Sequence, residues 1–184
     1  MHDTDSPSAW VRRWAPLVVS GARVLDVACG PGRHARFFAA RGATVDAVDR
    51  DVMAGHALQD EPAIRFLAAD IETGPWPYAG CRFDAVIVTN YLHRPLFGPL
   101  LAALAPGGVL IYETFAQGNA QFGKPSNPDF LLAPGELLQR CAGLHVLAYE
   151  DGVVEAPRPA RLQRICARAG VTEAAQLRLD PAPG

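Results

Sequence analysis

Lysine is nearly absent from this 184-residue chain, in which Lys124 is the single lysine among 17 basic residues. Phosphate-binding loops of the GK[ST] type, and catalytic motifs that pair lysine with tyrosine, depend on this residue, so its scarcity argues against both classes. Excess charge is missing too, because the formal net charge is −2. Tight binding to a polyanion depends on clustered lysine and arginine. We therefore expect no nucleic acid among the partners.

Cysteine pairs and metal-ligand patterns are also lacking. The four cysteines lie far apart in the sequence and form no CxxC motif, which argues against zinc knuckles and thioredoxin-like redox chemistry. The histidines are scattered without the spacing of metal ligands, so we predict no metal.

Long hydrophobic runs are missing as well. No apolar stretch approaches the ~20 residues that span a bilayer. The first residues, MHDTDSP, are acidic and polar, unlike the basic start and apolar segment of a secretory signal. These absences predict a cytoplasmic location and no membrane partner.

Short hydrophobic runs, several rich in valine or isoleucine, alternate along the chain with segments of helical spacing. Five such runs precede residue 116, at 23–28, 43–49, 64–69, 83–89 and 109–114. They are continuously apolar and do not alternate with polar residues, which is typical of parallel strands buried on both faces by helices. The pattern predicts a doubly wound α/β fold with a Rossmann-like sheet.

Helices are expected between these strands. Ala35, Phe38 and Ala39 share one helical face, with Gly42 as a C-terminal stop. The sequence from 49 to 51 can cap a short helix that ends at Leu58. Leu100, Leu101 and Leu104 indicate another helix, which starts near Pro99 and ends at the turn Pro106-Gly107-Gly108.

The C-terminal third adds a helix at about 134–141 and two more runs, at 144–149 and 161–167, which can form an antiparallel hairpin at the sheet edge. The complete prediction is a mostly parallel, seven-stranded sheet in a single domain covering 1–184. Its expected parts are an N-terminal cover (1–22), a cofactor-binding core (23–115), a lid loop with helix and edge hairpin (116–170), and a frayed tail (171–184). Trp10 and Trp14 lie in that cover, either on a helix over the cofactor or packed on the sheet edge.

A glycine loop follows the first predicted strand, where Ala28-Cys29-Gly30-Pro31-Gly32 leads into a helix. Two glycines allow the backbone to approach a ligand at a helix N-terminus. The signal is ambiguous, because the same residues satisfy the GxGxxG/A dinucleotide fingerprint, with Asp49 nineteen residues after Gly30. We read Cys29 as a small side chain that fills the turn.

Acidic residues at three strand ends favour a different ligand. Asp26, inside the end of the first strand, suits a cationic group better than a pyrophosphate. Asp49 ends the second strand and can accept hydrogen bonds from both ribose hydroxyls. Asp70 ends the third strand and can meet an adenine amino group, while Ile71 packs on the ring. One acid at each strand end suits a nucleoside that also carries an ammonium group, as S-adenosylmethionine does.

These features, together, resemble class I S-adenosylmethionine-dependent methyltransferases. The resemblance rests on 24–32, Asp49, 66–71, 83–90 and 104–112. It implies that the glycine loop holds the methionine end, Asp49 the ribose, Asp70 and Ile71 the adenine, and Asn90 the floor beside the sulfonium. The small size and the pattern Asp-x-Ala-Cys-Gly-x-Gly are similar to tellurite-resistance-type and thiol methyltransferases. The full predicted cofactor set is Asp26, Ala28, Cys29, Gly30, Gly32, Asp49, Arg50, Asp70, Ile71 and Asn90.

The segment 90–95 leaves the fourth strand at the same edge and supplies the acceptor-side candidates. His93 is suited to take a proton near neutral pH, and Tyr91 to orient the acceptor. Alternatively, His93 caps a backbone carbonyl. Arg94 and, from the lid loop, Phe122 and Lys124 are candidate substrate contacts, although Lys124 is equally an ordinary solvated charge.

The predicted function is methyl transfer to a small-molecule acceptor, giving S-adenosylhomocysteine. A nicotinamide-dependent oxidoreductase and a non-catalytic S-adenosylmethionine-binding partner or sensor stay open as alternatives. The accepting atom (sulfur, selenium, tellurium, nitrogen or oxygen), the need for a general base and the choice between monomer and homodimer are not given by these patterns.

Overall fold

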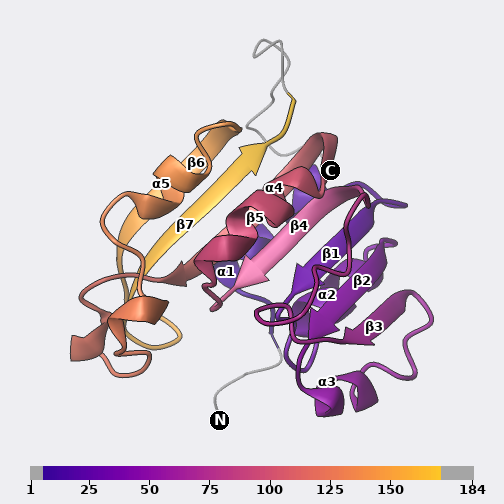
Figure 1. Cartoon of the computed structure of the whole chain (residues 1–184), viewed down its shortest axis with the longest axis horizontal. Helices are drawn as coiled ribbons and strands as arrows, with labels where there is room; N and C mark the ends of the chain where they lie inside the picture. The colour runs from indigo at the N-terminus through magenta and orange to yellow at the C-terminus, as the bar shows by residue number, and fades with distance from the viewer. Residues whose placement is uncertain (1–5, 171–184) are drawn as a thin grey trace.

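The computed structural model describes residues 6–170 and contains one seven-stranded sheet, ordered β3-β2-β1-β4-β5-β7-β6 (Figure 1). Strands β1 to β5 are parallel, and β7 is antiparallel to both β5 and β6. The strands are β1 (Arg23–Val27), β2 (Thr44–Asp49), β3 (Ile64–Ala68), β4 (Phe83–Thr89), β5 (Leu104–Phe115), β6 (His145–Val154) and β7 (Ala160–Arg168). The predicted fold class, with its antiparallel edge hairpin, is confirmed.

Helices cover both faces of the sheet (Figure 1). They are α1 (Ala9–Trp14), α2 (Arg33–Ala39), α3 (Val52–His56), α4 (Phe97–Ala102) and α5 (Glu136–Arg140), with short 3-10 turns between them. In Figure 1, α4 and α5 lie in front of the sheet, and α1 and α2 lie behind it. The expected helices therefore exist, although each is short.

The central strands are apolar throughout because they supply two cores at once. On β1, Leu25 packs into the core shared with α4 and α5, whereas Val24 packs into the core shared with α1 and α2. Both side chains are fully buried. Successive side chains of a strand point to opposite faces, so a strand between two helical layers has no polar face.

Several predicted boundaries differ from the structure, and three of them have a clear local cause. The helix expected to reach Leu58 ends at His56, and Asp51 caps it through Oδ1, which accepts from the Met53 N–H at 2.9 Å. The helix expected to include Leu104 ends at Ala102, because Leu104 already pairs with Phe83 as the first residue of β5. The predicted Pro106-Gly107-Gly108 turn is an irregularity inside β5. A side chain at Gly108 would lie 2.8 Å from the Ala105 carbonyl oxygen, which explains the glycine.

The N-terminal cover packs on the sheet. Trp10 is buried beside α2, and its Nε1–H donates to the Ile165 carbonyl of β7 at 3.2 Å. Of the two alternatives for this segment, packing on the sheet describes Trp10. The tail predicted for 171–184 lies outside the described residues. Within 6–170, no helix has the length and hydropathy to cross a membrane.

Candidate functional site

A cavity of about 410 Å³ lies along the carboxyl edge of the parallel strands. This edge is where open α/β sheets bind ligands, and the volume falls within the range of about 300–1,000 Å³ usual for small-molecule sites. Its lining comes from the ends of five strands and from the lid loop: Ala28, Asp49, Arg50, Ala69, Asp70, Ile71, Glu72, Asn90, Tyr91, Leu92, Thr114, Phe115, Pro125 and Phe130.

The glycine loop after β1 is built from left-handed backbone. Ala28 and Gly30 both have φ of +52°, and Gly32, the N-cap of α2, has φ of +78°. A side chain at Gly32 would collide with Leu58, at 2.4 Å. At Gly30, by contrast, no heavy atom lies within 4 Å of the position that a Cβ would take. Gly32 is therefore favoured by its left-handed φ and by the closeness of the Leu58 side chain, whereas Gly30 leaves open space for a ligand.

Asp49 ties the end of β2 to the glycine loop. Its Oδ2 accepts from the Gly30 N–H at 2.8 Å, and its Oδ1 accepts from the Asp51 N–H at 2.9 Å. Each carboxylate oxygen can still accept another hydrogen bond. The residue predicted to hold a ribose thus lines the cavity and also fixes the loop that would hold the rest of the cofactor.

Asp26 is buried beneath this loop, with 1% of its surface exposed. Its Oδ2 has no hydrogen-bond partner among the described residues. Burial raises its pKa to about 7, although a hydrogen bond from the Ala35 backbone and the charge of Arg33 lower it. Its neighbour Cys29 is also buried, and burial raises the pKa of that thiol, so it stays protonated and fits the packing role predicted for it.

Asp70 and Ile71 line the cavity at the end of β3. Asp70 accepts from the Thr73 hydroxyl at 2.8 Å and from the backbone N–H of Glu72 at 2.9 Å. The hydrogen bonds from Thr73 and then from Glu72 lower the pKa of this exposed carboxyl. Asp70 is thus an anion held in one orientation, beside the buried apolar side chain of Ile71.

Asn90 and Tyr91 continue the lining at the end of β4. Asn90 has φ of +55°, and its N–H donates to the Glu113 carbonyl of β5 at 2.9 Å. The Tyr91 carbonyl accepts from the Tyr112 hydroxyl at 2.8 Å. Burial and the nearby Glu72 carboxylate raise the pKa of Tyr91, so its phenol is neutral at physiological pH. The backbone here turns sharply and is held by two bonds to β5.

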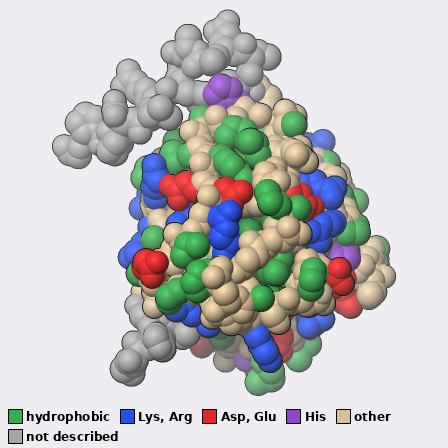
Figure 2. Space-filling model, turned by 90° about the vertical axis from the view of Figure 1, so that its left-hand side faces the viewer, with side chains coloured by type: hydrophobic (Ala, Val, Ile, Leu, Met, Phe, Trp, Pro, Cys, Tyr) green, Lys and Arg blue, Asp and Glu red, His purple; other side chains and the backbone are tan. Residues whose placement is uncertain are grey.

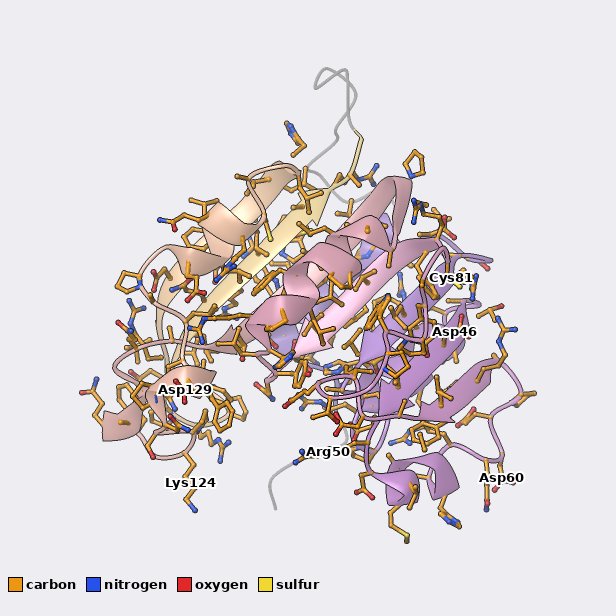
Figure 3. All side chains as sticks on the ribbon, in the orientation of Figure 1. Asp46, Arg50, Asp60, Cys81, Lys124 and Asp129 are labelled. Carbon is orange, nitrogen blue, oxygen red and sulfur yellow. The ribbon has the colours of Figure 1, made fainter. Side chains whose placement is uncertain are left out.

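The other acceptor-side candidates are absent from the cavity lining. His93 lies beside Glu72, with 3.9 Å between Nδ1 and Oε2. Arg94 faces α5, where its Nε and Nη2 donate to the two Glu136 carboxylate oxygens at 2.8 and 2.9 Å. Phe122 and Lys124 are exposed, and Lys124 extends away from the domain (Figure 3). The lid loop instead lines the cavity with Pro125 and Phe130.

Some lining residues were missing from the sequence prediction. Thr114 and Phe115 end β5, so the strand-end argument applied to Asp49 and Asp70 would have found them. Glu72 directly follows the predicted residue Ile71, and Leu92 directly follows Tyr91, so each lies next to a position that the sequence did indicate. Pro125 and Phe130 sit in an irregular loop whose conformation leaves no signal in the sequence. In the described part of the chain, no group of three or more His, Cys, Asp or Glu side chains is arranged to hold a metal ion.

Comparison with known proteins defines the class. Residues 24–108 match a family described as "Methyltransferase domain". The chain is 37% identical over 105 residues to a malonyl-[acyl-carrier protein] O-methyltransferase of Pseudescherichia vulneris, a match that covers 53% of this chain and 41% of that protein. It is 36% identical over 122 residues to a trans-aconitate 2-methyltransferase of Delftia acidovorans, covering 61% of this chain and 44% of the relative. The chain thus spans less than half the length of these relatives.

Among solved structures, TehB from Haemophilus influenzae superposes with a TM-score of 0.71 at 18% identity, over 87% of this chain and 61% of that one. At that identity the likeness concerns the fold. The predicted resemblance to methyltransferases is thus confirmed for the matched segment, and the fold is that of solved S-adenosylmethionine-dependent methyltransferases. The segment 24–108, which matches the methyltransferase-domain family, contains the ends of β1 to β4 but neither the end of β5 nor the lid loop.

Proposed function

We propose that the protein transfers a methyl group from S-adenosylmethionine to a small-molecule acceptor and releases S-adenosylhomocysteine. The observation that carries this proposal is the continuity of the cavity. One space runs from Ala28 past Asp49 and Asp70 to Asn90, and on to Phe115 and Phe130. A cofactor bound over the first part would therefore share a single cavity with an acceptor bound at the second.

The residues present fit this cofactor. The open space at Gly30 gives room for the methionine end. The unpartnered, buried Oδ2 of Asp26 supports a role in offsetting the positive amino group, because an orphaned buried oxygen is costly unless a cation or donor reaches it. Asp49 would hold the ribose. Asp70, Ile71 and Leu92 would hold the adenine, and Asn90 would lie beside the sulfonium.

The chain itself has little chemistry to perform. S-adenosylmethionine would supply an activated methyl group. The acceptor's lone pair would form the new bond to the methyl carbon while the carbon–sulfur bond breaks with its electrons staying on sulfur, and any proton lost by the acceptor would pass to a base of the protein. Alignment alone can contribute up to about 7–11 kcal/mol to such a step. The protein's task is to hold both molecules in line and to exclude water, for which the lid residues Pro125 and Phe130 are suitably placed.

Two residues with different placements would act on the acceptor. Tyr91 lines the cavity as a neutral phenol and would orient the acceptor by hydrogen bonding. His93 lies outside the lining and would take a proton through Glu72, whose carboxylate lies beside both side chains. A thiol that reaches the site already ionised would need neither residue as a base.

Calorimetric titration tests the proposal. The protein is titrated separately with S-adenosylmethionine, S-adenosylhomocysteine and NADH, and turnover is followed as S-adenosylhomocysteine formed with an acceptor panel. We expect saturable binding of the first two ligands and no response to NADH. NADH binding without S-adenosylhomocysteine binding would overturn the proposal in favour of an oxidoreductase. Binding without turnover of any acceptor would favour a non-catalytic sensor or partner.

A further inference from the structure

The charged side chains of the cavity are confined to one end. Asp49, Arg50, Asp70 and Glu72 line it at the exits of β2 and β3. The opposite end, at the exit of β5 and under the lid loop, is lined by Thr114, Phe115, Pro125 and Phe130, none of which carries a charge. We call these four residues the β5–lid wall. The proposed cofactor contacts account for the charged end, which leaves the β5–lid wall for the acceptor.

Arg94, one of the predicted substrate contacts, is already neutralised. Besides its two bonds to Glu136, the Arg94 guanidinium donates to the carbonyl oxygens of Asp129 at 2.7 Å and of Leu131 at 3.0 Å. The hydrogen bond from Arg94 is the largest cause that lowers the pKa of Glu136 to about 2, so the pair is fully ionised at neutral pH. Recruiting Arg94 to a bound anion would leave Glu136, 11% exposed in its side chain, without its main partner.

Two further basic side chains, Arg50 and Lys124, are no better placed. Arg50 lies next to Asp49 at the cofactor end, and Figure 3 shows it at the sheet edge, across the opening from the lid loop. Lys124 points away from the domain in the same view. An anionic group against the β5–lid wall would therefore lose its hydration without gaining a counter-charge, which is unfavourable.

We propose that the methyl acceptor is a small, uncharged, predominantly aromatic or apolar molecule, held by the β5–lid wall with its nucleophilic atom toward Asn90. This rests on the proposed function and specifies its substrate class. Phe115 and Phe130 offer aromatic contact, and Thr114 and Tyr91 can hydrogen-bond to a neutral polar group. The acceptor is small because a cavity of about 410 Å³ must hold it together with the cofactor.

Matched acceptor pairs test the inference. Each pair shares a nucleophile and differs by one carboxylate: phenol with 4-hydroxybenzoate, and 2-naphthol with 6-hydroxy-2-naphthoate. Methyl transfer from labelled S-adenosylmethionine and binding to the S-adenosylhomocysteine-saturated protein are both measured. We expect the neutral member to be favoured by about tenfold or more in kcat/KM or in Kd, the effect of burying an unpaired charge. Equal or better use of the carboxylates, or binding of neither member, would overturn the inference.

A variant pair links the preference to the wall. Phe130→Arg places a cation at the β5–lid wall. Its matched control is Val153→Arg, which places a cation on β6, away from the cavity. The two residues are similarly exposed, Phe130 at 52% and Val153 at 48%. In Phe130→Arg we expect the preference to shift toward the carboxylates by about tenfold, with unchanged affinity for S-adenosylhomocysteine. Val153→Arg should leave the preference unchanged.

An unshifted preference in Phe130→Arg would overturn the assignment of the wall. Failure of the proposed function is recognised separately, because the wild-type protein would then not bind S-adenosylhomocysteine at all.

Discussion

The two ends of the cavity are stabilised in different ways. At the exits of β1 to β4, the backbone itself makes the site: Ala28, Gly30 and Asn90 are left-handed, and Asp49 bonds directly to a loop N–H. At the β5–lid end, side chains hold an irregular loop in place, among them Asn119, which donates to the Pro125 carbonyl at 3.0 Å, and the Arg94–Glu136 ion pair. Arg94 joins the exit of β4 to α5 through Glu136, which also accepts from the Ala133 N–H at 3.0 Å.

The difference between the two ends of the cavity coincides with the limit of the family match. The methyltransferase-domain match covers 24–108, which contains the exits of β1 to β4, and stops before the β5–lid wall. The first end therefore indicates the cofactor class, whereas the acceptor depends on parts of the chain that the family match does not reach. Charge follows the same division, since the lining is charged at one end and uncharged at the other.

The hairpin end of the sheet differs again. Figure 2, which faces the left-hand side of Figure 1, shows acidic, basic and apolar side chains interspersed there, without a patch of one sign. Ion pairs cross β6 and β7, among them Arg161–Asp151 at 2.6 Å and Arg164–Glu150 at 3.2 Å. Gln163 of β7 reaches toward α5, and its Oε1 accepts from the Leu137 N–H at 3.0 Å. The hairpin thereby supports the acceptor end.

The largest effect is expected from Arg94→Met. The change removes the main partner of Glu136 and leaves only Arg140, at 3.2 Å, and the Ala133 N–H, so the free energy of unfolding should fall by about 1–3 kcal/mol. Because the pair holds the lid, KM for the acceptor should rise while Kd for S-adenosylhomocysteine stays unchanged. Denaturant unfolding and calorimetry measure these quantities. Arg94→Lys keeps the charge but loses the bidentate hydrogen bond, so its loss of unfolding free energy should be intermediate. Unchanged stability in Arg94→Met would contradict the role of this pair.

Asp49→Ala should act on the opposite end. It leaves the Gly30 and Asp51 N–H groups unpaired and removes the proposed ribose contact, so S-adenosylhomocysteine binding should weaken by about 1–3 kcal/mol. Asp60→Ala is the matched control, because Asp60 is exposed and absent from the cavity lining (Figure 3). An Asp49→Ala protein with wild-type affinity would count against the ribose role.

A pH dependence should accompany cofactor binding. The pKa of Asp26 is raised to about 7 by burial, so this carboxyl binds a proton in the folded protein as the pH falls below 7. Binding of a cationic amino group favours the ionised form. The affinity for S-adenosylhomocysteine should therefore decrease below pH 7, by up to about tenfold per pH unit. Asp26→Asn should remove this dependence, and calorimetry at pH 5.5, 6.5 and 7.5 measures it. An identical pH profile in the variant would exclude Asp26 as its source.

Before any ligand binds, the same raised pKa affects folding. Asp26 contributes stability to the folded state when it is protonated, and this contribution is complete below the unfolded value near 3.8 and lost as the pH rises through about 7. Asp26→Asn should thus make the protein relatively more stable than the wild type at pH 8, as thermal unfolding can show.

The smallest effect is expected from His93→Ala. Because His93 is outside the cavity lining and acts only through Glu72, turnover should fall a few-fold with hydroxyl or amine acceptors and stay unchanged with ionised thiols. Steady-state kinetics with both acceptor types makes the comparison. A large loss with thiols as well would place His93 in direct contact with the reacting atoms.

The strands and the acids at their ends could be predicted because both depend on local sequence. A continuous apolar run gives a buried strand, and the residue after it lies at the sheet edge, as Asp49 and Asp70 do. The Arg94–Glu136 pair could not be predicted, since it joins residues 42 positions apart through tertiary packing. The conformation of the lid loop could not be predicted either. Phe122 and Lys124 were expected at the cavity, but Pro125 and Phe130 line it.

The central claim is that the two ends of the cavity act separately, one for the cofactor and one for the acceptor. The most direct test is the dissociation constant of S-adenosylhomocysteine, measured by calorimetry in the wild type, Asp49→Ala and Arg94→Met under identical conditions. The account predicts weaker binding in Asp49→Ala by about 1–3 kcal/mol and wild-type binding in Arg94→Met. Equal losses in both variants would contradict it.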